Sequence, residues 1–287
     1  MLVDVVSVIV RALSFIAILQ AAGMTIFLPV LGSALAAQTQ RALRQLTRRS
    51  ALIALPLLLL HFVLEPARMG GDFAAVADSQ LQVMALHSPM ATALAWKLAG
   101  MFLIAVGTIW SWKRGKELAL LGAAVALVGF TQTGHTATHC AHLILQCLLW
   151  MHLAIGAFWF GALLPLNRIV RNEPAPMAAA IIQLFSFIAG WLVPMLAVAG
   201  IAMAWLLLGS VSALATAYGV LLLGKLLLFA VLMVLAALNR WRHGPALASQ
   251  RNGAANAFRF TVLVEYFLLL GVLLATATLT TLFSPES

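Results

Sequence analysis

The feature that most constrains this chain is a series of long apolar runs that recur from one end of the sequence to the other. About 20 apolar residues in a helix span the hydrocarbon core of a bilayer, where every backbone polar group must be bonded internally. Only 9% of the residues are charged, against about 25% in soluble domains, and the mean hydropathy is +1.05. The sequence therefore predicts an all-α, polytopic integral membrane protein, with residues 1–287 forming a single transmembrane domain in the lipid bilayer.

Eight runs have the length of a membrane span, and no alternation typical of β-strands interrupts them. The start of the chain lacks the basic region and small-residue cleavage site of a secretory signal, so we interpret the first run as a retained helix. The predicted spans lie at about 8–31, 50–70, 90–111, 118–135, 143–166, 180–208, 217–238 and 260–282.

The basic residues are distributed unevenly between the connections. Of the 17 lysines and arginines, thirteen lie in the connections after the first, third, fifth and seventh runs. Cytoplasmic loops are enriched in Lys and Arg, so these connections are predicted to face the cytoplasm and both termini the outer side. Topology thus accounts for the net charge of +9, and we do not expect nucleic acid as a partner.

Side chains that bind metals are concentrated between Gly134 and Leu166. If this run continues as a helix from its start, the first three histidines lie at i, i+4 and i+7 on one face. Imidazole and thiolate groups suit copper and zinc better than magnesium or calcium, so we predict a metal site on the outer side. Ordinary hydrogen-bonded or solvated histidines at a membrane edge are the alternative. The group comprises His135, His139, Cys140, His142, Cys147 and His152.

Two other features of this kind remain open to two interpretations each. The two cysteines lie about 10 Å apart along a helix, too far for a disulfide, and are either ligands or packing residues. The longest outer connection, 71–89, and its flanks carry thioether and imidazole groups, which favour Cu(I), although such methionines are also ordinary apolar filler. These residues are Met69, Met84, His87 and Met90.

Ionisable side chains inside the predicted spans form a further group. Four of them, from four spans, lie about 10–13 Å below the outer ends, whereas Glu265 lies nearer the cytoplasm. Glu65 is four residues after His61, so its carboxylate can orient that imidazole, and it lies within reach of Lys97. The lysines suit anions or carboxylates; a purely structural network is the alternative. The group comprises His61, Glu65, Lys97, His152, Lys225 and Glu265.

Two stretches resemble the CopD family of copper-resistance inner-membrane proteins. The first is the GH of Gly134–His135 followed by MHLAIGAFWFGALLPL, which contains His152 and Trp159. The second is TAYGVLLLGKLLLFAVLMVLAALNR, which contains Lys225, Asn239 and Arg240 and is followed by Glu265 in the last span. The resemblance is clearest over about 130–283, and the first four spans match mainly in hydropathy.

The resemblance implies a bacterial inner-membrane protein with periplasmic termini that handles copper, often together with a soluble periplasmic copper carrier of the CopC type. It carries over most directly to His135 and His152, whereas we do not map His139, Cys140, His142 and Cys147 to family positions. The acidic residue that often precedes the fifth-span histidine is missing, because 148–151 reads LLWM.

We therefore expect a protein that moves copper, as Cu(I) or Cu(II), from periplasm to cytoplasm through outer ligands and an intramembrane site at His152 and His61. No Walker loop, nucleotide fingerprint or Ser/His/Asp constellation is present, so we do not expect an enzyme. Two alternatives stay open. One is a haem b protein with His61 and His152 as axial ligands. The other is an assembly factor that delivers copper to an oxidase without transport.

Overall fold

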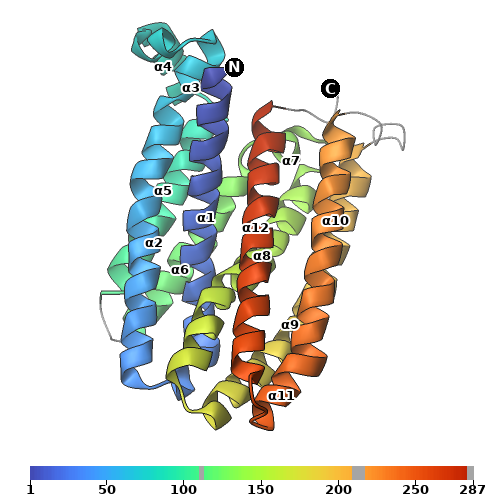
Figure 1. Cartoon of the computed structure of the whole chain (residues 1–287). Helices are drawn as coiled ribbons and strands as arrows, with labels where there is room; N and C mark the ends of the chain where they lie inside the picture. Colours follow the sequence, from blue (N-terminus) through green and yellow to red (C-terminus); the bar gives the residue numbers. More distant parts are fainter. Residues whose placement is uncertain (110–112, 209–216, 283–287) are drawn as a thin grey trace.

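The computed structural model describes residues 1–109, 113–208 and 217–282 (Figure 1). Every regular element assigned in this part of the chain is a helix, so the predicted all-α fold is confirmed. The α-helices are α1 (Leu2–Leu31), α2 (Ala37–Val63), α3 (Glu65–Gly70), α4 (Ser79–Leu86), α5 (Pro89–Gly107), α6 (Lys113–Thr131), α7 (His135–Thr138), α8 (His142–Asn172), α9 (Ala175–Leu208), α10 (Ala217–Leu238), α11 (Gly244–Ala248) and α12 (Ala254–Leu282). Short 3-10 turns lie at Gly32–Ala34 and Phe73–Ala77, and a π-helical turn, η4, lies at Asn239–His243.

Seven helical segments in the described part are long and apolar enough to cross a membrane, one fewer than the sequence predicted. The span predicted at 118–135 is the exception. Its helix, α6, has 19 residues, and its sequence begins KRGKE, with four charged side chains among the first five. The apolar remainder ends at Thr131, so it falls short of the about 20 residues that a span requires. The predicted count of eight spans was therefore one too high by length and composition, although α6 packs along α5 and returns the chain towards the terminal side of the bundle (Figure 1).

The long helices alternate in direction, so the start of α1 and the end of α12 lie at the same end of the bundle (Figure 1). Helices α3, α4 and α7 also lie at this end, which we call the terminal end. The start of α2, the end of α8 and α11 lie at the opposite end, and these segments and their flanks carry many of the arginines. We call it the basic end. The fold therefore separates most arginines from the termini, as the alternate-loop pattern predicted.

Helix α1 is central, with contacts to α2, α5, α6, α8 and α12. Its approach to α8 requires glycine on both sides, since a Cβ on Gly161 would lie 2.6 Å from the Cα of Gly23. The same holds between α5 and α6, where a Cβ on Gly122 would lie 2.7 Å from the carbonyl oxygen of Gly100. Small residues let membrane helices pack backbone to backbone, which strengthens their association in lipid.

The buried apolar side chains form two main clusters. One joins α1, α2, α5 and α6 to α8 and contains Ile18, Met101 and Ile104. The other lies chiefly between α8, α9, α10 and α12 and contains Trp159 and Phe185. Helix α8 contributes to both clusters, so polar side chains on its different faces lie in different surroundings.

Candidate functional site

The histidine-rich stretch is not one continuous helix. Helix α7 ends at Thr138, a turn follows at 139–141, and α8 begins at His142. The amide of His142 donates to the carbonyl of His139 at 3.0 Å within this turn. The predicted arrangement of three histidines at i, i+4 and i+7 on a single helix face is therefore wrong. The side chain of His135 lies outside the part that the structure describes.

His139 and Cys140 place two soft ligand atoms side by side at the terminal end. Cys140 Sγ lies 3.6 Å from His139 Nδ1, and the same nitrogen accepts the backbone N–H of Ala141 at 3.0 Å. Cys140, His142 and Cys147 are exposed, and both cysteines are free, as the spacing predicted. Across the described residues, no group of three or more His, Cys, Asp or Glu side chains is arranged to hold a metal ion.

The second predicted ligand group lies elsewhere at the terminal end. Met84 lies on α4, and His87 follows that helix with Nδ1 donating to the carbonyl of Val83 at 2.8 Å. Met69 lies on α3 and Met90 at the start of α5. Helix α4 lies above α1 and α2, whereas α7 lies behind α12 and α10 (Figure 1). The structure does not bring these methionines and His87 together with the turn at 139–141.

His152 is held in one orientation against α9. Its Nδ1 lies 3.1 Å from the carbonyl oxygen of Leu196, and a carbonyl only accepts, so Nδ1 carries the proton. The lone pair of Nε2 is left for another partner. Gly200 makes room for the ring, because a Cβ there would lie 3.3 Å from His152 Cε1. Lys225 of α10 is close enough for its charge to act on this imidazole.

The contact between His152 and Leu196 replaces the acidic partner that the family resemblance led us to expect. The acidic residue expected shortly before His152 is absent, but the carbonyl of Leu196 orients the ring instead. Histidines that bind metals commonly donate their second N–H to a backbone carbonyl or a carboxylate, which fixes the tautomer. His152 has the same arrangement, with Nδ1 bonded to a carbonyl and the lone pair on Nε2.

A buried polar network lies below His152, on the side of the basic end. Asn239 Nδ2 donates to Glu265 Oε1 at 2.6 Å, and Thr261 Oγ1 donates to Asn239 Oδ1 at 2.5 Å. The indole of Trp159 also donates to Glu265. Trp159 follows His152 by seven residues, so both lie on one face of α8. We call His152 and this network the polar column.

The sequence only partly revealed the polar column. Asn239 and Trp159 entered through the family resemblance, and Glu265 was identified as a costly carboxylate within a span. Thr261 was missed, although it precedes Glu265 by four residues and so shares its helix face. Glu265 is 3% exposed and Asn239 8% exposed, which explains why their polar atoms need partners within the protein.

His61 lies in different surroundings from His152. Helix α2 ends at Val63, and Glu65 begins α3, where its carboxylate accepts two hydrogen bonds from Arg68, at 2.7 and 3.2 Å. Glu65 therefore does not orient the imidazole as predicted, and His61 Nδ1 is buried without a hydrogen-bond partner.

Lys97 also has a different contact from the predicted one. Its Nζ lies 4.4 Å from the ring centroid of Phe130, a cation–π contact, instead of pairing with Glu65. The positive charges near His61 come from Arg11, Lys97 and Arg68. Sequence reasoning missed the role of Arg11 and Arg68; the available signal was that both lie outside the arginine-rich connections.

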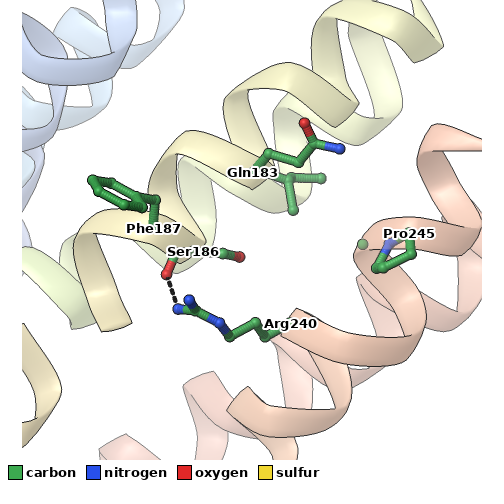
Figure 2. Close-up of a pocket in the computed structure, with 7 residues that line it drawn as sticks. Gln183, Ser186, Phe187, Arg240 and Pro245 are labelled. Carbon is green, nitrogen blue, oxygen red and sulfur yellow. Dashed lines mark hydrogen bonds between the residues drawn. The ribbon is translucent and has the colours of Figure 1, made fainter. Parts of the chain in front are cut away.

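Arg240 adds a contact at the basic end that topology alone did not predict. From η4 its guanidinium reaches α9 and donates to the carbonyl of Ser186 (Figure 2). Gly190, one turn further along α9, leaves the space that the guanidinium occupies. The contact borders a pocket of about 190 Å³, also lined by Gln183 and Pro245 (Figure 2).

These features define a class of protein. The chain is a polytopic α-helical membrane protein with an oriented histidine and a buried Glu–Asn–Trp network between its C-terminal helices. The family model "Copper resistance protein D" matches residues 179–279, and "Copper resistance protein D-like, N-terminal domain" matches residues 1–145. The chain belongs to the copper resistance protein D family. The resemblance stated from the sequence is thus confirmed, and it extends to the first four predicted spans, which had matched mainly in hydropathy.

A curated relative supports a membrane location. "Inner membrane protein YebZ" of Escherichia coli (strain K12) is 29% identical over 168 residues, which cover 58% of this chain and 54% of YebZ. The match thus spans about half the length of that relative. No solved structure matches the chain.

Proposed function

We propose that this protein carries copper across a bacterial inner membrane, from the terminal end, facing the periplasm, to the basic end, facing the cytoplasm. Family membership supports copper as the substrate, and the basic connections support the orientation. The observation that carries the proposal is the orientation of His152, whose ring is fixed by Leu196 and Gly200 with Nε2 unprotonated.

His152 suits copper for reasons of donor chemistry. A neutral imidazole is a good ligand for both Cu(I) and Cu(II), and the site lies in an apolar helix where an unpartnered ring nitrogen is costly. Lys225 cannot bind the metal while it is protonated, so its role is to hold an anionic partner or to exclude other cations. The polar column then leads from His152 towards the basic end through Trp159 and Glu265.

Capture is assigned to the turn between α7 and α8. His139 Nδ1 and Cys140 Sγ are close enough to bind one ion together if copper displaces the N–H of Ala141 from the imidazole. His142 and His135 are additional donors from the flanking helices. The exposure of Cys140 and His142 at the terminal end allows a soluble periplasmic carrier of the CopC type to deliver the ion there.

The test is copper uptake into vesicles that contain the purified protein. His152→Ala should abolish uptake while copper binding at the outer turn persists, and His87→Ala is the matched control because that imidazole caps its own helix. Normal uptake per folded His152→Ala molecule would refute the proposal. A Soret band in the purified protein would support haem b with His61 and His152 instead. Absent uptake by the wild type, with copper transferred to an oxidase, would support the assembly factor.

A further inference from the structure

Positive charge accumulates near the terminal end, on helices other than α8, which carries His152. Arg11 on α1, Arg68 on α3 and Lys97 on α5 all act electrostatically on His61 of α2. We call these four residues the cationic cluster. The arginine-rich connections, which account for most of the basic residues, lie at the other end of the bundle, so topology does not explain this cluster.

The negative charge nearby does not balance the cluster. Glu65 is bound by both Nε and NH2 of Arg68, and the carboxylate of Asp4 lies 3.1 Å from the amino group of Met1. Within the described part of the chain, Arg11 and Lys97 form no ion pair. They contact aromatic rings instead, Arg11 over Phe15 at 5.8 Å and Lys97 over Phe130 at 4.4 Å. An arginine does not lose its proton, so the cluster has excess positive charge.

Several buried polar atoms in and beside the cationic cluster also lack hydrogen-bond partners. Four buried side-chain atoms in the described part have none, and three of them belong to Ser7, Arg11 and His61. Ser7 is 1% exposed and lies one turn before Arg11 on α1. NH1 of Arg11 donates to the carbonyl of Thr280 at 2.8 Å, whereas its Nε has no acceptor. Each such buried group costs about 1–3 kcal/mol, so a ligand that accepts hydrogen bonds is favoured.

We propose that the cationic cluster binds a small inorganic anion of the class of chloride, between Ser7, Arg11 and His61. Such an ion accepts several N–H and O–H hydrogen bonds and supplies the missing negative charge. Water alone would satisfy the hydrogen bonds but not the charge, and a metal cation would be repelled by Arg11, Arg68 and Lys97. This site is separate from the proposed copper ligand His152 and does not depend on copper transport.

The first measurement compares the melting temperature in sodium chloride and in sodium gluconate at equal ionic strength. A ligand that binds only the folded protein raises Tm in a saturable way, by about 5–10 °C at a hundredfold excess over Kd. Chloride should produce this rise and gluconate, which is too large for the site, should not. Equal melting temperatures in the two salts would overturn the proposal.

Variants then locate the effect. Ser7→Ala should weaken the chloride dependence about five- to tenfold without loss of a native bond, because the Ser7 hydroxyl has no partner. Arg11→Gln should remove the dependence, and Arg41→Gln, an exposed arginine at the basic end, is the matched control. If Arg11→Gln does not fold, the chloride dependence of the melting temperature of Ser7→Ala tests the site. Bromide anomalous scattering should give a peak beside Arg11 Nε, and an unchanged chloride response in Ser7→Ala or no peak at this position would refute the site.

Discussion

Replacement of Asn239 by leucine tests whether the Glu265 network stabilises the fold. Leucine keeps the branching of asparagine at Cγ, so the change removes the amide without opening a cavity. Glu265, 3% exposed, would lose the donor at 2.6 Å and keep the indole of Trp159. Thr261 would lose one acceptor, but its single hydroxyl proton could be donated to the carbonyl of Ala257 or of Phe258, at 3.1 and 2.9 Å.

The main cost of Asn239→Leu is therefore one unsatisfied buried carboxyl oxygen, about 1–3 kcal/mol of unfolding free energy. Asn256→Leu is the matched control, since Asn256 is exposed on α12, and we expect a change within about 0.5 kcal/mol. Reversible unfolding in mixed micelles measures both. A double-mutant cycle with Glu265→Gln should show a coupling of about 0.5–3 kcal/mol. A cost below that of Asn256→Leu, or no coupling, would refute the reasoning.

Two other predictions concern packing and topology. Gly161→Ala should destabilise the protein by about 1–3 kcal/mol, because the new methyl would meet the backbone of α1. Gly156→Ala on the same helix should change stability by less than about 0.5 kcal/mol, since its nearest neighbour would be a Leu196 methyl 3.9 Å away. In a cysteine-free background, an impermeant thiol reagent should label Ser79→Cys from the periplasm and Ser249→Cys only after lysis. The reverse labelling pattern would contradict the proposed orientation.

The sequence predicted the helices better than their contacts. Hydropathy located the spans because lipid requires long apolar helices, and it failed at α6, where charges occupy the start of a short helix. Periodicity assumed an unbroken helix from His135, yet the chain turns at 139–141 before α8 begins. Sequence spacing describes neighbours on one helix and cannot reveal a local break.

The candidate site required contacts between helices that are distant in the sequence. The partner of His152 is a backbone carbonyl of α9, which no side-chain motif can indicate. His61 and Glu65 were paired by spacing, whereas Glu65 binds Arg68 because α2 ends between them. Glu265 was recognisable as a buried carboxylate, but its partner Asn239 could be found only through the family resemblance.

The electrostatics of the two halves favour His152 over His61 as the copper ligand. At about 10 Å and an effective dielectric constant of about 20, one unit charge repels a monovalent cation by about 1.7 kcal/mol. Arg11 and Arg68 against the carboxylate of Glu65 leave an excess of one positive charge near His61, which opposes copper there by about 1.7 kcal/mol, or roughly twentyfold. Lys97 adds to this opposition only while it is protonated. Among the described residues, the positive group that acts on His152 is Lys225, and a lysine, unlike an arginine, can release its proton. An anion bound at Arg11 would offset this excess, and the preference for His152 would then rest on the orientation of its ring by the carbonyl of Leu196.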